Sequence, residues 1–490
     1  MKNYFILLTL LITIGCQPSS PNPQTPFAEL IKLVDQYAEQ TLKQGNINSL
    51  AVAIYKDSLS YRNYYGEIDK NQGNRPNDST LYEIASISKI FVGSLAAKAV
   101  VEKKISLDDD IRMYLDGDYE NLEFDGSPVK VRHLLSHTLG FEAPDNFLAV
   151  YRKIFDGFYQ DKTIDYSMED LLEELKTVAL IKQPGTYYDY SNAGPELMAH
   201  ILEQVYEKPY KDLLSAFFDD LGLQNTHLQD FEKHEKYLSN GYDEQQNKAT
   251  LIKNPLLGGA GGIISTLPDL TKFMQFQLES SEPWIKESTR LLFEDGEDDT
   301  GYFWDLGRGT REGFYYKKSG SSNGIQSILL ICPDANYGLI LIMNNQSDEA
   351  LYDWIRLYNR IENDLIEYPK INAWSSVEMA FLTDPKGAAK QYQQLAKDTA
   401  TYFAASDYLN GVGYDFLGKG QVQNAIALFE LAVSVDPENA NLHDSLGETY
   451  FIAQVYDKSK EHYKKSLELD PTNDNAKKYL SEIDRLLSAQ

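Results

Sequence analysis

The chain has 490 residues, of which 12% are aromatic and 24% are charged. This is the composition of a globular protein with two or three domains, and it excludes a disordered tail or a bundle of membrane helices. The 73 acidic residues outnumber the 46 lysines and arginines, which gives a net charge of -27. Because this charge repels phosphate backbones and the sequence has no local basic patch, we expect no nucleic-acid partner.

The first residues, MKNYFILLTLLITIGC, have the pattern of a processed targeting segment. One lysine precedes an apolar run of roughly a dozen residues, which is too short to cross a bilayer as a helix. The pattern resembles a bacterial lipoprotein signal over residues 1–16, in which Cys16 becomes the lipidated first residue of the mature chain; a plain secretory signal is the alternative. Residues 17–26, rich in proline and serine, would then tether the folded protein to the lipid. We expect a lipid-anchored protein of the cell envelope that faces the periplasm.

The first predicted domain, residues 27–369, mixes strand and helix signals without an internal repeat. Residues 49–66, rich in Val, Ile and Tyr, predict two strands joined by a Lys-Asp-Ser turn. Residues 89–104 predict a helix with little polar face, which is typical of a centrally buried helix. Residues 313–345 predict three successive strands. The expected fold class is therefore α+β, with helices packed against an antiparallel sheet.

The second predicted domain, residues 370–490, repeats itself after 34 residues. Under this shift Gly413 aligns with Gly447, and Pro437 aligns with Pro471. Small residues recur where two helices would cross closely, and proline recurs after the second helix ends. The period and residue types resemble the tetratricopeptide repeat, which implies an all-α domain that binds a protein partner. Two repeats alone are marginally stable, so we expect them to lean on neighbouring helices or on a partner. The predicted parts are repeats at 406–439 and 440–473, a closing helix at 475–487, and a weaker helical pair from about residue 375.

The stretch YEIASISKIF, residues 82–91, places Ser86 three residues before Lys89 in an otherwise apolar segment. A second Ser-x-x-Lys, at residues 127–130, contains Pro128, which disfavours the helix that would bring its serine and lysine onto one face. Ser86 instead lies at the start of an apolar helix, where the helix dipole favours negative charge. The pair is either a nucleophile with its base or a surface pair on an ordinary helix.

Two further short motifs lie later in the first domain. Tyr190-Ser191-Asn192 lies in a loop that begins with Pro-Gly and runs into an apolar helix. Lys318-Ser319-Gly320 lies where a predicted strand begins. Each motif is weak alone, because an aromatic residue in a turn and a lysine at a solvated strand edge are both common.

Taken together and in this order, the three motifs resemble the serine active-site family that includes class C β-lactamases, D-alanyl-D-alanine carboxypeptidases and related esterases. The resemblance covers about 340 residues. It implies that Ser86 attacks a carbonyl and becomes acylated, while Lys89 and Tyr190 share its proton as general base and later as acid. It also implies that Asn192 hydrogen-bonds Lys89 and a substrate amide. Tyr190 can act only if neighbouring ammonium groups stabilise its phenolate.

The resemblance assigns the substrate contacts to the last motif. The oxyanion would rest on the backbone N–H groups of Ser86 and Ser321. Lys318 and the Ser319 hydroxyl would hold a substrate carboxylate, and Gly320 completes the motif. Lysine at 318, where many relatives have histidine, favours substrates that carry a carboxylate. Pro195 and the short segment between the second and third motifs leave the substrate itself open.

No metal or cofactor is expected. His133 and His137 have a spacing that suits a metal, but the zinc-protease glutamate is missing, and in the resembled family this segment is structural. The glycine-rich stretch LGGAGG, residues 257–262, lacks the Gly-Lys-Ser/Thr of a phosphate loop and predicts close backbone packing beside the site.

The leading hypothesis is a serine hydrolase that cleaves an amide or ester bond of a D-alanyl peptide, a β-lactam or an acyl ester through an acyl-enzyme on Ser86. One alternative is a sensor or scaffold of the penicillin-binding type that is acylated without turnover. Another is a repeat adaptor with an inactive hydrolase domain.

Overall fold

The computed structural model describes residues 24–142, 166–249 and 255–488. The described residues divide into two compact units, one of residues 33–366 and one of residues 24–32 and 367–488. The predicted signal peptide and Cys16 lie outside the described residues, and the first helix, α1 (Gln24–Lys43), begins within the last residues of the predicted tether. Among the described residues, no helix is both long and apolar enough to cross a membrane.

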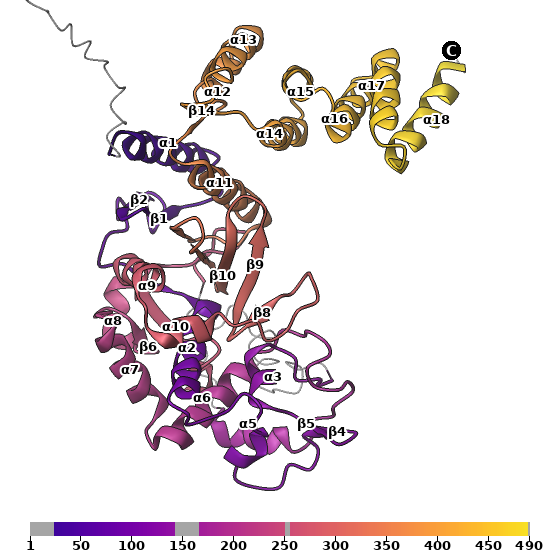
Figure 1. Cartoon of the computed structure of the whole chain (residues 1–490). Helices are drawn as coiled ribbons and strands as arrows, with labels where there is room; N and C mark the ends of the chain where they lie inside the picture. Colours follow the sequence, from indigo (N-terminus) through magenta and orange to yellow (C-terminus); the bar gives the residue numbers. More distant parts are fainter. Residues whose placement is uncertain (1–23, 143–165, 250–254, 489–490) are drawn as a thin grey trace, which may run out of the picture. The chain divides into compact units, whose positions relative to one another are not determined.

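A seven-stranded antiparallel sheet forms the frame of the first unit (Figure 1). Its strand order is β2-β1-β12-β11-β10-β9-β8. Strands β1 and β12 are buried at every position, as expected for a sheet covered on both faces. This confirms the predicted α+β class and the strands expected at 49–66 and 313–345. The strands are β1 (Ser49–Lys56), β2 (Leu59–Gly66), β8 (Thr300–Gly301), β9 (Trp304–Gly309), β10 (Gly313–Ser322), β11 (Ile325–Cys332) and β12 (Tyr337–Met343).

The hairpin between β1 and β2 has the predicted turn. Lys56 pairs with Leu59, which leaves Asp57 and Ser58 as a two-residue loop. Both loop residues have positive φ, 50° and 71°, and this matches the twist of the flanking strands in tight hairpins. Polar residues that tolerate this backbone therefore mark the turn in the sequence.

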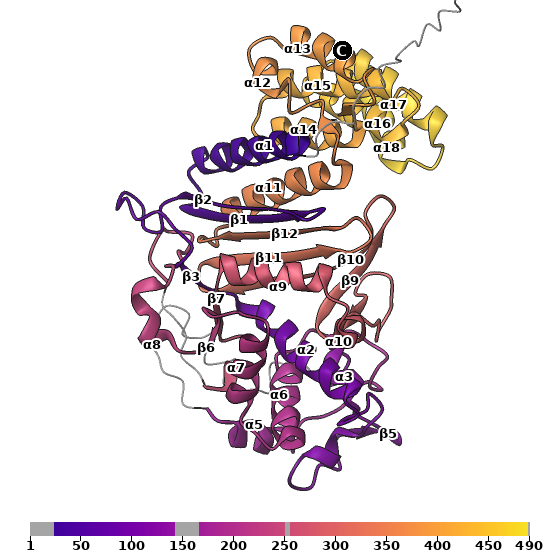
Figure 2. The ribbon, with the colours of Figure 1, turned by 60° about the vertical axis from the view of Figure 1, so that its left-hand side comes forward.

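Helices pack around the sheet. Figure 2 shows α1 and α11 (Asp348–Glu367) running beside β1 and β2, and α9 (Leu267–Glu279) beside β11. Tyr37 of α1 donates a hydrogen bond to Asp364 of α11, so the two helices are also joined to each other. The other α-helices among the described residues of this unit are α2 (Ser88–Val101), α3 (Val131–Leu135), α5 (Met168–Leu175), α6 (Ala193–Tyr206), α7 (Tyr210–Asp220), α8 (Phe231–His234) and α10 (Pro283–Ser288).

Helix α2 is the predicted apolar helix, and it lies in the core as expected. Eleven of its residues are buried, among them Lys89, which is fully buried. Phe91 packs against Phe218 and Phe273 with ring centroids 5.3 and 4.7 Å apart. Short strands complete this unit: β3 (Leu81–Glu83), β6 (His227–Leu228) and β7 (Ile263–Thr266) form a small sheet, and β4 (Glu123–Phe124) pairs with β5 (Ser127–Pro128).

The second unit is helical, with one short parallel pair of strands. The predicted repeats at 406–439 and 440–473 each contain two helices. A Cβ on Gly413 would lie 2.5 Å from the Phe429 ring, and one on Gly447 would lie 3.0 Å from the Tyr463 ring. This explains why glycine recurs at that position. The elements are β13 (Ile371–Asn372), α12 (Glu378–Phe381), α13 (Pro385–Leu395), β14 (Tyr402–Phe403), α14 (Ser406–Gly418), α15 (Val422–Val435), α16 (Ala440–Ile452), α17 (Tyr456–Leu469) and α18 (Asp474–Ser488).

The helices before the repeats share their core. Trp374, Phe381 and Tyr392 are fully buried in the same cluster as the residues of α14 and α15. The repeats therefore pack against neighbouring helices, as expected.

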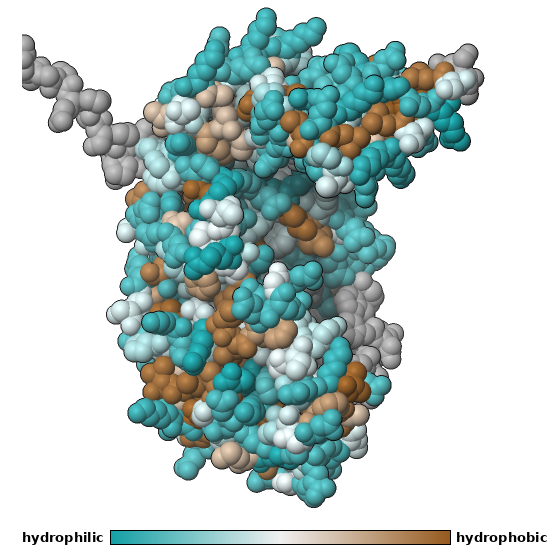
Figure 3. Space-filling view, turned by 45° about the vertical axis from the view of Figure 1, so that its right-hand side comes forward, coloured by the Kyte–Doolittle hydropathy of each residue, from teal (hydrophilic) through white to brown (hydrophobic). Residues whose placement is uncertain are grey.

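Side chains on the face seen in Figure 3 are mainly hydrophilic, with hydrophobic ones in scattered groups, as is normal for a protein surface.

Candidate active site

Ser86 and Lys89 lie at the start of α2 and contact each other. The chain leaves β3, makes one short turn over Ala85–Ile87 and continues directly into the helix. Lys89 Nζ lies 3.0 Å from Ser86 Oγ and 2.6 Å from the Ala260 carbonyl oxygen. A buried ammonium without acceptors would be costly, so these two contacts explain how an apolar helix can hold a lysine. They also place the Lys89 side chain within hydrogen-bond reach of the Ser86 hydroxyl, where it can take part in proton transfer.

The backbone presents Ser86 on a strained turn. Ala85 has φ 46°, a left-handed conformation that costs free energy for a residue with a Cβ. A Cβ on Gly320 would clash with the carbonyl oxygen of Ile84, so β10 passes directly beside this turn. The glycine of the third motif is therefore needed for the strand to approach the nucleophile.

Tyr190 reaches Ser86 from a loop more than one hundred residues later. Its Oη lies 2.8 Å from Ser86 Oγ. Lys89 Nζ and Lys318 Nζ lie 5.1 and 5.2 Å from the centre of its ring. Burial alone would raise the pKa of the Tyr190 phenol, but the two ammonium groups, with hydrogen bonds to Lys89 and Ser86, bring this pKa below its ordinary value.

Lys318 lies on β10, at the point where the pairing of that strand with β9 ends. β9 pairs with β10 from Gly313 to Lys317, and in the described part of the chain no strand continues this pairing along Lys318–Ser322. The unpaired side of a strand offers backbone N–H and C=O groups to a ligand. Ser319 and Ser321 are exposed, and the Ser321 hydroxyl accepts a hydrogen bond from Gln326 at 2.7 Å.

Comparison with known proteins identifies the family of the first unit. The family model described as beta-lactamase matches residues 34–359. The chain belongs to the beta-lactamase family. A tetratricopeptide repeat model matches residues 440–473, which confirms the second predicted repeat. The recognition of both families from their motifs is therefore confirmed.

Individual members of the family are distant. A beta-lactamase of Providencia stuartii is 24% identical over 74% of this chain and 96% of its own length. Protein flp of Staphylococcus aureus strain N315 is 22% identical over 70% of this chain and 68% of its own length. A beta-lactamase/D-alanine carboxypeptidase from Yersinia pestis complexed with citrate has a TM-score of 0.59 at 21% identity, covering 70% of this chain and 99% of that one. At this identity the structural likeness establishes the beta-lactamase fold alone.

Within this beta-lactamase fold, His137 holds the loop that carries Tyr190. Its carbonyl oxygen accepts a hydrogen bond from the Asp189 N–H at 2.8 Å, and its Nδ1 accepts one from the Ser191 N–H at 3.2 Å. Its ring packs on the Tyr190 ring, with centroids 4.6 Å apart. Burial and the charges of Lys318 and Lys89 hold the pKa of His137 well below its ordinary value, so this ring is neutral. The histidine treated as structural in the sequence therefore positions the phenol.

Glu196 is a buried carboxyl group that no sequence motif indicated. It accepts hydrogen bonds from the N–H groups of Gly259 and Ala260, at 3.1 and 3.0 Å. These bonds fix the loop whose Ala260 carbonyl oxygen contacts Lys89. Burial raises the pKa of Glu196 to about 8, against the backbone hydrogen bonds and the charge of Lys89, which lower it. The glycine-rich stretch thus lies beside the site, as expected, and the hydrogen bonds to Glu196 hold its backbone in place.

Asp305 is the second group that the sequence did not indicate. Its Oδ1 lies 2.9 Å from Lys318 Nζ. The Lys318 side chain is 3% exposed and that of Asp305 is 38% exposed, so the carboxylate faces the open side of the pair. Burial alone would lower the pKa of Lys318, but Asp305 and Tyr190 raise it above its ordinary value. Lys318 is therefore a permanent cation in this site.

The structure brings four of the predicted residues, Ser86, Lys89, Tyr190 and Lys318, into one small cluster. Asn192 directly precedes α6, two residues after Tyr190, and Ser319, Gly320 and Ser321 follow Lys318 on β10. The family-implied contacts of Asn192 and the two serines with substrate remain predictions. His133 has a local contact instead: its Nδ1 accepts a hydrogen bond from the Lys130 N–H at 3.0 Å, at the start of α3.

Proposed function

We propose that this chain is a serine hydrolase that cleaves an amide or ester bond through an acyl-enzyme on Ser86. The observation that carries the proposal is the position of Tyr190, which touches Ser86 and lies between two ammonium groups. Such an arrangement lets a phenol act as a base at a lower pH than an ordinary tyrosine would, because the cations favour its ionised form. Family membership supports the same chemistry.

The first half of the reaction forms the acyl-enzyme. Ser86 Oγ attacks the substrate carbonyl carbon while its proton passes to the Tyr190–Lys89 pair. The carbonyl oxygen becomes an oxyanion, which the N–H groups of Ser86 and Ser321 would stabilise; one such donor is typically worth about 100- to 1000-fold in rate. The same pair then returns the proton to the leaving oxygen or nitrogen, and the acyl group stays on Ser86.

The second half releases the acid. A water molecule gives a proton to the Tyr190–Lys89 pair and attacks the acyl carbon, and Ser86 leaves with that proton. A sensor or scaffold of the penicillin-binding type would stop before this step. The two functions therefore share every contact described above and differ only in deacylation.

Three substrate classes fit this chemistry: D-alanyl peptides, β-lactams and acyl esters. Lys318 and Ser319 would hold a substrate carboxylate, as the family pattern implies, only if the substrate can replace Asp305 at the ammonium group. Asn192 would bind a substrate amide. The proposed mechanism uses no cofactor or metal.

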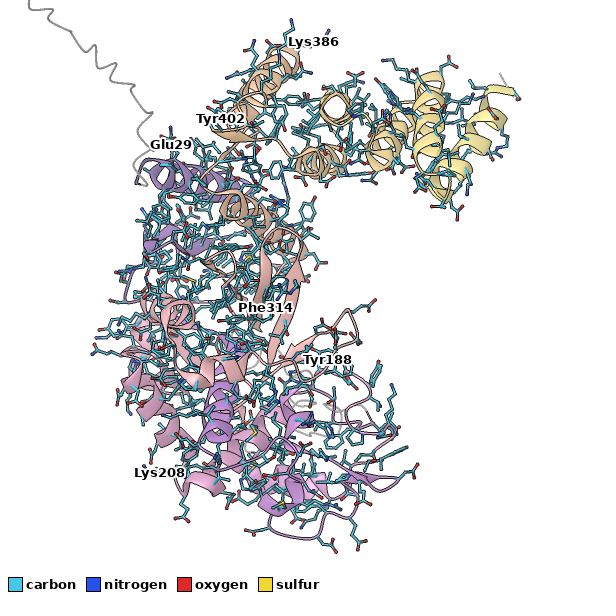
Figure 4. The ribbon with its side chains drawn as sticks, viewed as in Figure 1. Glu29, Tyr188, Lys208, Phe314, Lys386 and Tyr402 are labelled. Carbon is cyan, nitrogen blue, oxygen red and sulfur yellow. The ribbon has the colours of Figure 1, made fainter. Side chains whose placement is uncertain are left out.

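The helical repeats and the predicted anchor complete the proposal. The match to a tetratricopeptide repeat supports a protein-docking role for residues 406–488. A pocket of about 570 Å³ in the same unit is lined by Lys370, Gln393 and Lys397 beside Tyr402, which Figure 4 labels. Lipid attachment at Cys16 would hold the hydrolase at the cell envelope, facing the periplasm.

Activity-based labelling tests the proposal. A fluorophosphonate and a fluorescent penicillin should each be tried on the wild type and on Ser86→Ala. Steady turnover of a chromogenic ester or cephalosporin by the wild type would establish an enzyme, and a single burst would favour the sensor. Equal labelling of both forms would remove Ser86 from its role.

A further inference from the structure

The ion pair between Lys318 and Asp305 compensates the one charge that the family pattern reserves for a substrate carboxylate. The two groups are 2.9 Å apart, and the lysine is almost completely buried. A buried ammonium with a contacting carboxylate already has an anionic partner. A carboxylate on the substrate would therefore meet a pair, not a free cation.

Packing fixes the backbone that carries Asp305. Tyr302 and Phe303 form the two-residue loop between β8 and β9, with φ of 52° and 69°. Such loops normally use glycine or asparagine, so two aromatic residues there are strained and must be held by their surroundings. Both are fully buried, and the Phe303 N–H donates a hydrogen bond to the Leu135 carbonyl oxygen at 2.9 Å. The buried hairpin therefore holds the backbone of Asp305 in a fixed position beside Lys318.

The segment before this hairpin adds more negative charge to the same side of the site. Residues 294–299 contain five acidic residues, and they lie between Phe293 and Thr300, which pair with each other. Phe293 stacks on Tyr188 with ring centroids 6.4 Å apart (Figure 4 labels Tyr188). After burial, the carboxylates of Asp305 and Asp298 are the largest causes that raise the pKa of Tyr188, two residues before Tyr190.

We infer that Asp305 is a specificity-determining residue that makes this site select substrates whose group beside Lys318 is uncharged. Neutral acyl esters and amides are then preferred over D-alanyl peptides and β-lactams that carry a free carboxylate. A substrate carboxylate would have to share one ammonium with a fixed carboxylate, and like charges that close repel. The inference rests on the proposed function, since it concerns the substrate of the Ser86 acyl-enzyme.

Lys318 has a different task in this account. Its ammonium lies 5.2 Å from the centre of the Tyr190 ring, where it stabilises the phenolate. Asp305 keeps that ammonium charged in its buried position. Lys318 therefore stabilises the ionised form of Tyr190, the general base, and does not bind a substrate anion.

A matched pair of ligands tests the inference by binding alone. The depsipeptide hippuryl-phenyllactate carries a free carboxylate, and its carboxamide twin has the same ester without the charge. Their Kd values are measured on Ser86→Ala, which cannot turn them over, and on the same protein with Asp305→Asn added. We expect Ser86→Ala to bind the carboxamide more tightly, and Asp305→Asn to improve carboxylate binding relative to carboxamide binding by about 10-fold.

The control is Asp298→Asn in the same background, which removes one negative charge from the neighbouring acidic segment without removing the Lys318 partner. We expect a clearly smaller shift in the ratio of the two Kd values. Tighter binding of the carboxylate ligand by Ser86→Ala, or no gain with Asp305→Asn beyond that of Asp298→Asn, would overturn the inference. Absence of turnover by the protein with Ser86 intact would instead count against the proposed function, because the binding measurement does not depend on it.

Discussion

The two units of this chain use polar residues in opposite ways. The beta-lactamase-family unit buries two lysines, a histidine and a glutamate around Ser86 and partly buries Tyr190, and its site residues come from segments far apart in the sequence. The repeat unit buries mainly apolar side chains, and its helices meet where Gly413 and Gly447 leave room for an aromatic ring. In the first unit, the packing of the core holds polar and charged groups in position around Ser86. In the second unit, the repeated sequence pattern packs one helix against the next.

The difference predicts how each unit responds to substitution. Burying charges costs free energy, and the beta-lactamase-family unit offsets that cost through contacts between the groups. Removing one group therefore alters the chemistry of the others. The repeat unit depends on neighbouring helices only, so a change there should stay local.

The largest effect is expected from Ser86→Ala. Loss of the nucleophile should remove fluorophosphonate labelling and lower the turnover of an ester substrate by about 10,000-fold or more. Ser127→Ala, in the other Ser-x-x-Lys of the chain, should leave both unchanged, because Ser127 lies in the short strand β5. Labelling that persists in Ser86→Ala and disappears in Ser127→Ala would reverse the assignment.

Tyr190→Phe should be next in size. It keeps the ring against His137 but removes the hydroxyl that touches Ser86, so the acylation rate should fall by about 100- to 10,000-fold with little change in melting temperature. The wild-type rate should rise with pH below 10, because ionisation of Tyr190 creates the base. Tyr119→Phe, in another Tyr-x-Asn, is the control and should act like the wild type. An unchanged rate in Tyr190→Phe would show that Lys89 works alone.

The sequence predicted the parts of the site that have motifs and missed those that depend on topology. Ser86, Tyr190 and Lys318 were found because their neighbours follow a family pattern, and the β1–β2 hairpin was found because Asp57 and Ser58 suit its turn. The β8–β9 hairpin has Tyr302 and Phe303 in its loop, which give no turn signal. Asp305 follows that hidden turn, so nothing local indicated that it meets Lys318.

Glu196 was missed for a related reason, since it lies in the first turn of an apolar helix where a glutamate is ordinary. The repeat unit was predicted more completely, because its contacts lie within one or two helices and recur with a fixed period. Long-range pairs of charged residues leave no such trace in a single sequence.

The pH dependence of the free energy of unfolding should show whether Glu196 is protonated in the folded protein. Its pKa is raised to about 8 in the folded protein, above the ordinary value of 4.5. The folded state therefore binds this proton more tightly, and the contribution of Glu196 to the free energy of unfolding is lost as pH rises through that range, by at most about 1.4 kcal/mol per pH unit. Glu196→Gln should show a flatter decline of stability between pH 5 and 8 in urea titrations. Identical slopes in the two proteins would contradict a neutral buried Glu196.

A smaller, local effect is expected in the repeat unit. Gly413→Leu forces a side chain into the Phe429 ring and should destabilise the helical unit by about 1–3 kcal/mol. Hydrolase activity should stay unchanged, because all the site residues lie in the other unit. Gly411→Leu, in the same helix with open space around it, is the matched control and should not destabilise this unit. Thermal unfolding followed by circular dichroism, with an ester assay on the same samples, measures both quantities.

The central claim is that two ammonium groups keep the partly buried Tyr190 phenol easy to ionise. Carbon-13 labelling of the tyrosine Cζ atoms, with NMR spectra recorded across pH, tests it directly, and Tyr190→Phe identifies the signal. We predict that the Tyr190 signal titrates below pH 10, while buried tyrosines such as Tyr302 titrate above it. A Tyr190 signal that also titrates above pH 10 would contradict the account.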